Sequence, residues 1–163
     1  MKIKSILFLL LLAFPVFAVS QKTNYVGYQH KGVVYGKNLP NGVKDLGGGL
    51  LSNEDYGVSR YTKNGNDMLW LEKILSRDAK GVPTWQVKDV LMLDKLRKNQ
   101  ELLFSYSSTC TINGRESLNL IVLAELAGNK KSFKILKAWH ASVENEKFKK
   151  ISISGIRCEV DGN

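Results

Sequence analysis

Two cysteines constrain the fold of this chain more than any other feature of its sequence. Cys110 ends a run, 101–110, in which apolar residues alternate with polar ones, and Cys158 ends a second such run, 148–158. Alternation with a period of two is typical of a β-strand that is buried on one face. In an exported chain, two cysteines are more often paired than reduced. We therefore expect a Cys110–Cys158 disulfide between two strands, with two reduced buried thiols as the alternative.

The N-terminus has the features of a cleaved signal peptide. Lys2 and Lys4 form a short basic segment, and an apolar stretch of 14 residues, 6–19, follows it. A membrane anchor is the alternative, but a helix that spans a bilayer needs about 20 apolar residues. The small residue Ala18 suits cleavage by signal peptidase. We therefore expect a signal peptide over 1–18 and a periplasmic or secreted mature chain without a transmembrane segment.

The mature chain is expected to be basic, with its charge concentrated near the C-terminus. The whole chain has a formal net charge of +9, and removal of Lys2 and Lys4 leaves +7. Residues 128–158 contain eight Lys or Arg and two Glu, so this segment alone has a charge of +6. Such a surface can attract an acidic protein or an anionic envelope polymer. The alternative is a solvated sheet face whose lysines protect strand edges from aggregation. Nucleic acid is not an expected partner of an exported protein.

Apolar periodicity predicts a mainly β, antiparallel domain over 58–163. Its predicted strands are 84–93, 101–110, 117–127, 132–141 and 147–158. An apolar run at 67–76 precedes a Gly81-Val82-Pro83 turn, so we interpret it as the first strand of a hairpin. Helices over 67–76 and 117–127 are the alternative, and they would make the fold α+β. The segment 19–57 contains eight of the 14 glycines and is predicted to be irregular.

The strand predicted at 84–93 has an acidic residue on its apolar face. Strict alternation puts four apolar side chains on that face: Trp85, Val87, Leu91 and Leu93. Asp89 falls on the same face, so we expect it to have a polar partner or to lie at a sheet edge. In the last strand the apolar face changes between Ile153 and Ile156, which predicts a β-bulge at Ser154-Gly155.

The basic surface is expected on the hairpin formed by 132–141 and 147–158. Alternation puts three apolar residues on the core face, which are Phe133, Ile135 and Trp139. Lys134 and His140 would then face outward together. Lysines of the neighbouring strand would lie beside them, which are Lys147, Lys149 or Lys150 depending on the register. We call these five basic residues the predicted basic surface, and we expect a partner to bind there.

The residue pattern predicts no catalytic, metal or nucleotide site. Gly47-Gly48-Gly49 lacks the Gly-Lys-Ser/Thr ending of a phosphate-binding loop, so we expect a flexible loop there. Two histidines, His30 and His140, together with a paired cysteine couple do not supply the ligands of a zinc site. The adjacent acids Glu54 and Asp55 have the residue type of a glycosidase site, but acids on a Gly-rich loop are more often solvated. We expect neither a cofactor nor an enzymatic activity.

The C-terminal half resembles uncharacterised exported bacterial proteins. The resemblance rests on four short patterns: Trp85-x-Val-x-Asp-Val-Leu-x-Leu93, Cys110-x-x-Asn-Gly114, Ala138-Trp139 and Gly155-Ile-x-Cys158-Glu159. It implies export and a pair of cysteines, and it implies no activity.

Size, export and charge together favour an exported binding protein. In its most specific form this would be an inhibitor or immunity protein that blocks an envelope-acting enzyme. The alternative is a structural or accessory envelope protein that binds anionic cell-wall or outer-membrane groups through its basic surface. A hydrolase that uses carboxylate catalysis is the third hypothesis.

Overall fold

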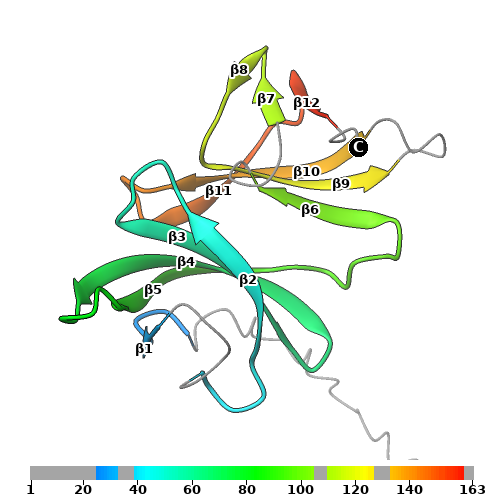
Figure 1. Cartoon of the computed structure of the whole chain (residues 1–163). Coiled ribbons are helices and arrows are strands. Elements are labelled where there is room, and N and C mark those ends of the chain that lie inside the picture. Colours follow the sequence, from blue (N-terminus) through cyan, green and yellow to red (C-terminus); the bar gives the residue numbers. More distant parts are fainter. Residues whose placement is uncertain (1–24, 33–38, 105–109, 127–132, 160–163) are drawn as a thin grey trace, which may run out of the picture.

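The protein has an antiparallel all-β fold, as the sequence predicts. A computed structural model describes residues 25–32, 39–104, 110–126 and 133–159, and all regular structure in these ranges is strand (Figure 1). The predicted signal peptide lies outside the described residues. Within the described ranges, no helix is long and apolar enough to cross a membrane. The segments 67–76 and 117–127, for which helices were the alternative, contain strands.

A curled five-stranded sheet forms one side of the molecule, in the order β1-β5-β4-β3-β2. Its strands are β1 (Gln29–Lys31), β2 (Lys44–Leu50), β3 (Tyr56–Lys63), β4 (Asn66–Arg77) and β5 (Pro83–Met92). Asn64 and Gly65 have φ values of 52° and 76°, as a tight hairpin turn between β3 and β4 requires. The segment 19–57 was predicted to be irregular, but it supplies β1, β2 and the first residues of β3. The predicted boundary between 57 and 58 therefore falls inside a strand.

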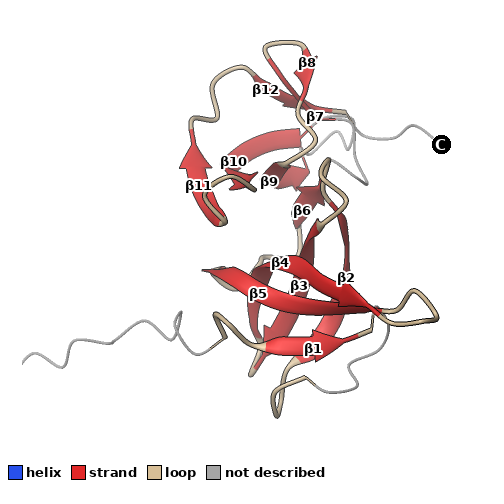
Figure 2. Ribbon diagram, turned by 90° about the vertical axis from the view of Figure 1, so that its left-hand side faces the viewer, coloured by secondary structure: helices blue, strands red, loops and turns tan. Residues whose placement is uncertain are grey.

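Two further sheets stack on the first to make three layers (Figure 2). The four-stranded sheet has the order β11-β10-β9-β6, with β6 (Gln100–Phe104), β9 (Leu120–Leu126), β10 (Phe133–Ser142) and β11 (Lys147–Ile151). The three-stranded sheet has the order β12-β7-β8, with β7 (Cys110–Ile112), β8 (Arg115–Glu116) and β12 (Ile156–Cys158). Strand β9 is covered on both faces, as its apolar residues on both sides predict.

Each interface between layers has its own apolar core. Leu69 and Leu71 of β4 pack with Ile121 and Trp139 of the four-stranded sheet. On the other side of that sheet, its apolar side chains pack against the three-stranded sheet; this set includes Leu103, Leu120, Val122, Ala138, Cys110 and Ile156. A third cluster, centred on Trp70, fills the concave side of the five-stranded sheet. That concave side carries the candidate site described below.

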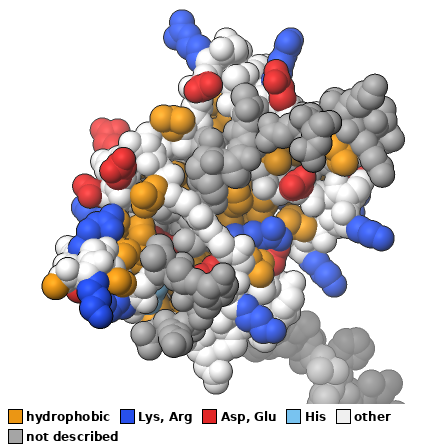
Figure 3. Space-filling model, in the orientation of Figure 1, with side chains coloured by type: hydrophobic (Ala, Val, Ile, Leu, Met, Phe, Trp, Pro, Cys, Tyr) orange, Lys and Arg blue, Asp and Glu red, His pale blue; other side chains and the backbone are white. Residues whose placement is uncertain are grey.

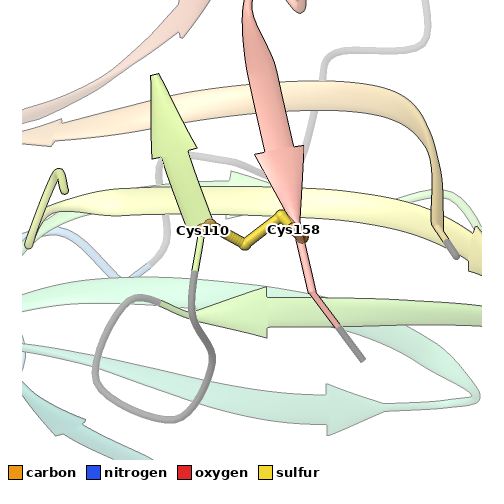
Figure 4. Close-up of a disulfide and its surroundings, with 2 residues drawn as sticks. All are labelled: Cys110 and Cys158. Atoms are coloured by element: carbon orange, nitrogen blue, oxygen red, sulfur yellow. A yellow bond between two sulfur atoms is a disulfide. The ribbon is translucent and has the colours of Figure 1, made fainter. Parts of the chain in front are cut away.

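The predicted disulfide is confirmed. Cys110 in β7 and Cys158 in β12 are directly opposite each other in register, and their sulfur atoms are bonded (Figure 4). The sequence separation of 48 residues means that the bridge encloses β8, β9, β10 and β11. It therefore fixes the outermost layer, whose strands contain only two or three residues each.

Two predicted strands are wrong in their extent because the chain changes sheets within them. The strand predicted at 101–110 ends as β6 at Phe104, and Cys110 begins β7 in the three-stranded sheet. Residues 105–109 lie outside the described residues. The strand predicted at 147–158 is two strands, β11 and β12, in different sheets. Ser154-Gly155 forms a turn between them instead of the predicted bulge, and Gly155 has a φ of 77°.

A β-bulge in β5 changes the predicted face of that strand. Val87 is opposite Glu72 and Asp89 is opposite Leu71, so Lys88 is an extra residue in β5. Trp85 and Val87 consequently face the concave side of the sheet, while Asp89 and Leu91 face the four-stranded sheet. The prediction that Trp85, Val87, Leu91 and Leu93 share one face is therefore wrong.

A second bulge, in β10, separates residues that the sequence analysis placed together. Ile135 is opposite Ala124 and Lys137 is opposite Leu123, so Leu136 is the extra residue. Beyond the bulge the alternation is reversed. Phe133, Ile135 and Ala138 pack toward the three-stranded sheet, whereas Leu136 and Trp139 pack toward the five-stranded sheet. The predicted common face of Phe133, Ile135 and Trp139 is therefore wrong.

Candidate functional site

A cavity of about 120 Å³ opens on the concave side of the five-stranded sheet. All five strands contribute to its lining, which includes His30 of β1, Asp45 of β2, Tyr61 of β3, Glu72 of β4 and Trp85 of β5. The backbone of Gly47, Gly48 and Gly49 forms one wall along the edge strand β2. We call this cavity the β-sheet pocket.

A buried carboxylate lies at the β-sheet pocket. Glu72 is only 2% exposed, although it is in the middle of an apolar strand. His30 Nε2 donates a hydrogen bond to Glu72 Oε1 over 2.5 Å, and the Tyr61 hydroxyl contacts the same oxygen over 3.4 Å. Glu72 Oε2 has no hydrogen-bond partner among the described residues. One oxygen is therefore held in place, and the other remains available to a ligand.

Tyr61 stays a neutral phenol in this environment. Burial raises the pKa of the Tyr61 hydroxyl well above its ordinary value, and the negative charge of Glu72 raises it further. A hydrogen bond with Ser59 lowers the pKa, and the Asp45 carboxylate raises it by a smaller amount than Glu72 does. Both carboxylates thus act on one phenol, so the pocket concentrates negative potential around Tyr61.

The wall formed by β2 depends on glycine. A Cβ atom on Gly48 would lie 2.6 Å from the carbonyl oxygen of Val58 and 2.7 Å from Ser59 Cα, so any side chain there would force the two backbones apart. Gly47 has a φ of 98°, and its N–H donates a hydrogen bond to Asp45 Oδ1 over 2.7 Å. The register between β2 and β3 shifts here, so the segment is a bulged strand and not the predicted flexible loop.

An aromatic cluster supports the pocket from below. The Trp70 ring is fully buried, and its centroid lies 4.2 Å from that of Tyr61 and 5.0 Å from that of Tyr25. His30 also contacts Trp70, with a centroid distance of 6.2 Å. This packing restricts the rotamers of His30 and Tyr61, so the polar groups are positioned before a ligand arrives.

The chemical groups of the pocket are suited to binding. A carboxylate, an imidazole and a phenol converge in one partly enclosed hollow, which is the usual composition of a ligand site. Within the described ranges, no group of three His, Cys, Asp or Glu side chains is arranged to hold a metal ion. From the sequence, His30 was considered only as a zinc ligand, and Glu72 was not predicted as a site residue. The available signal was an acid inside the apolar run 68–75, because such a residue needs a partner when buried.

The structure divides the predicted basic surface between two faces. His140, Lys147 and Lys149 share the face that carries Ile151, whereas Lys150 is on the opposite face with Phe148. Lys134 is opposite Glu125 in register, on the side of Leu123. The prediction that Lys134 and His140 face outward together is therefore wrong, because the bulge at Leu136 reverses the alternation between them.

His140 is a half-buried residue of this divided surface. It lies in β10 between Leu120 of β9 and Lys149 of β11. Burial lowers the pKa of His140, and the neighbouring Lys149 cation lowers it further. His140 is therefore mainly neutral at pH 7, and the positive charge on this face comes from Lys147 and Lys149.

The rest of the surface seen in Figure 3 mixes the two charge signs. Acidic and basic side chains are interspersed over this face, and basic side chains gather at its left, around the tip of the hairpin between β4 and β5. That tip contributes Arg77 and Lys80 to a second, more open hollow, which shares Leu50 and Trp85 with the β-sheet pocket. The two hollows therefore adjoin each other at Leu50 and Trp85, and we call them together the groove.

Comparison with protein-family models, curated proteins and solved structures finds no match to this chain.

Proposed function

We propose that this protein is an exported binding protein that receives a group of its partner in the β-sheet pocket. The observation that carries the proposal is Glu72, a carboxylate that is 2% exposed and keeps one oxygen without a protein partner at a cavity. Burial of a charged group is unfavourable unless the group is paired. A sequence that keeps such a group beside an open hollow is typical of a binding site.

The size of the pocket limits what it can hold. A volume of about 120 Å³ corresponds to about four water molecules, whereas drug-sized ligands occupy pockets of about 300 Å³ or more. The pocket therefore suits a single side chain or a very small molecule. A side chain inserted by a partner protein fits the inhibitor or immunity-protein form of the proposal, because buried anchor residues carry much of the energy of protein–protein binding.

The rim of the pocket offers surface for the rest of such a partner. Leu50, at the boundary of the two hollows, is 44% exposed, and Leu46 on the same strand is 49% exposed. Arg77 and Lys80 line the adjoining hollow. An apolar patch with basic neighbours suits a partner whose own rim is acidic.

Export is part of the proposal. The predicted signal peptide over 1–18 supports it, and the Cys110–Cys158 disulfide is compatible with an oxidising compartment. A protein located there would meet envelope-acting enzymes.

A second candidate function rests on β11. Lys147 and Lys149 are exposed on this edge strand and have no ion-pair partner among the described residues. Unpaired lysines on one face support binding to anionic cell-wall or outer-membrane groups, which would make the protein an accessory envelope protein.

Partner capture from periplasmic extract separates the two functions. The mature protein would be immobilised and washed with low salt and then with about 0.3 M salt, which screens exposed charges. We expect a partner that resists salt and is lost with Leu50→Asp, since this change places a charge in the groove. A double Lys147→Glu, Lys149→Glu variant should retain the partner. Capture that is lost in salt and in the lysine double variant, but not with Leu50→Asp, would instead support the accessory function.

A further inference from the structure

The charge of the β-sheet pocket indicates the chemistry of its ligand. Two carboxylates, Glu72 and Asp45, line the pocket. The lining also contains Lys31, but its Nζ is held by Asp78 Oδ2 over 2.8 Å, outside the pocket lining. With the Lys31–Asp78 pair set aside, the lining holds two acidic side chains against one imidazole. The formal charge of the pocket is therefore negative.

We infer that the β-sheet pocket binds an ammonium group, carried by a small primary amine or by a lysine side chain of a partner. This inference rests on the proposed function, because it assumes that a ligand group enters the β-sheet pocket. An ammonium group has three N–H donors and no acceptor. The pocket offers the matching set of acceptors: Glu72 Oε2, the Asp45 carboxylate, the Tyr61 hydroxyl and Ser59 Oγ.

The aromatic walls add a second attraction for a cation. Trp85 and Tyr61 both line the pocket, and cations are attracted to the faces of such rings. Close packing keeps Trp85 in place, since a Cβ on Gly57 would lie 3.3 Å from its ring. The volume of about four waters leaves room for the ammonium group and two or three methylene groups.

Other ligand classes fit less well. An anion would be placed against two carboxylates with no uncommitted cation in the pocket, and like charges at short range are strongly unfavourable in a buried site. A divalent metal ion needs several ligands, and the described part of the chain contains no suitable group of three acidic, His or Cys side chains. A neutral alcohol would leave Glu72 without a compensating charge.

The test is a titration of the folded mature protein with n-propylammonium, followed by two-dimensional NMR of backbone amides and Trp indoles. The matched probes are n-propanol, which is neutral, and propionate, which is anionic. We expect n-propylammonium to shift the signals of Trp85, Tyr61 and Gly48, and to bind at least ten-fold more tightly than either matched probe. Equal binding of n-propanol, or no shift of these signals up to about 50 mM amine, would overturn the inference.

Variants connect the binding to the two carboxylates. Glu72→Gln keeps the shape of the side chain and removes its charge, and we expect it to weaken n-propylammonium binding at least ten-fold. Asp45→Asn changes a partly exposed group and should weaken binding several-fold; it keeps the inference testable if Glu72→Gln does not fold. Asp94→Asn is the control, because Asp94 is 87% exposed and pairs with Lys137 away from the pocket. Folded Glu72→Gln or Asp45→Asn protein with unchanged affinity would overturn the inference.

A second arm distinguishes the two sources of the ammonium group. The probes are acetyl-Gly-Lys-Gly-amide and n-propylammonium. Tighter binding of the peptide would identify a lysine side chain of a partner, and tighter binding of the free amine would identify a small molecule. Partner capture and amine affinity that both survive Glu72→Gln would overturn the inference and leave the proposed function intact. Conversely, if the pocket binds n-propylammonium but no captured partner depends on Leu50, the inference would stand and the proposed function would fail.

Discussion

The backbone N–H of Phe148 donates a hydrogen bond to the Asp89 carboxylate over 2.9 Å, and this bond joins two sheets. Asp89 is a residue of β5 in the five-stranded sheet, and Phe148 is a residue of β11, the edge of the four-stranded sheet. The bond satisfies a backbone donor on an exposed sheet edge and at the same time supplies the partner that a buried acid requires. The expectation that Asp89 has a partner is confirmed.

Replacement of Asp89 by alanine should destabilise the fold. The change removes a partly buried hydrogen bond to a charged acceptor and leaves the Phe148 N–H without this partner, so we expect a loss of about 2 kcal/mol in the free energy of unfolding. Urea denaturation measures it. Asp94→Ala is the matched control, because the Asp94 carboxylate forms an exposed ion pair with Lys137 and should contribute less than about 0.5 kcal/mol. Equal losses in the two variants would contradict a special role for Asp89.

A second contact between the sheets predicts a dependence of stability on pH. Glu146 accepts a hydrogen bond from the Tyr56 hydroxyl over 2.7 Å and pairs with Lys88 over 2.9 Å. The hydrogen bond from Lys88 is the main cause that lowers the pKa of Glu146, and the bond from Tyr56 adds to it. A carboxyl whose pKa is lower in the folded state stabilises the fold above its unfolded pKa, and loses that effect as the pH falls toward the folded pKa.

The expected result is that Glu146→Gln reduces the acid dependence of the free energy of unfolding. The difference between wild type and variant should be largest above about pH 5 and should shrink as the pH falls below about 4.3, the usual pKa of a glutamate. Urea denaturation at a series of pH values measures it, with Glu101→Gln, a change at an exposed residue of β6, as the control. A difference that stays constant from pH 7 to acid conditions would mean that Glu146 acts only through its shape.

The disulfide should contribute a large part of the stability of the outer layer. Replacement of both Cys110 and Cys158 by serine releases a crosslink between residues 48 positions apart, and we expect a loss of about 2–5 kcal/mol. Thermal unfolding with and without a reductant gives an independent measure on the unmodified protein. A double variant as stable as wild type would show that the three-stranded sheet is held by its apolar contacts alone.

The regular parts of this fold follow from local patterns. Period-two alternation and the turn residues Asn64-Gly65 and Asn113-Gly114 are local signals, so the strands and hairpins could be predicted from them. The bulges in β5 and β10 could not be predicted in this way. An extra residue at Lys88 or Leu136 leaves no local signal in composition, because its position depends on how the neighbouring strand pairs.

The candidate site could not be predicted either, because it also depends on how distant strands pair. Its acid and its histidine, Glu72 and His30, are 42 positions apart and meet only because β1 pairs with β5, next to β4. The glycines of β2 were interpreted as a flexible loop because glycine usually weakens a strand. Here a close approach of two backbones requires glycine, and such an approach cannot be read from the chain itself. The basic residues were visible in the sequence, but the separation of Lys134 from His140 follows from the bulge in β10.

The proposed export predicts a defined N-terminus for the mature protein. Cleavage after Ala18 should give a periplasmic product that begins at Val19, and intact-mass spectrometry of that fraction measures it. A full-length product in the membrane fraction would contradict the prediction and would remove the compartment in which the proposed partner is expected.

Substitution of Gly48 should affect both stability and the pocket. A Cβ at this position would lie 2.6 Å from the Val58 carbonyl oxygen and 2.7 Å from Ser59 Cα, and both contacts are to backbone. Strand β2 must therefore move away from β3, which we expect to cost about 1–3 kcal/mol in the free energy of unfolding of Gly48→Ala. Because the same strand forms a wall of the β-sheet pocket, n-propylammonium should also bind more weakly to the folded variant.

Leu46→Ala is the control on the same strand, since Leu46 is 49% exposed and its loss should change stability by no more than about 0.5 kcal/mol. A Gly48→Ala variant that matches wild type in both measurements would show that β2 can shift without disturbing the site, and the glycine wall would then have no role in binding.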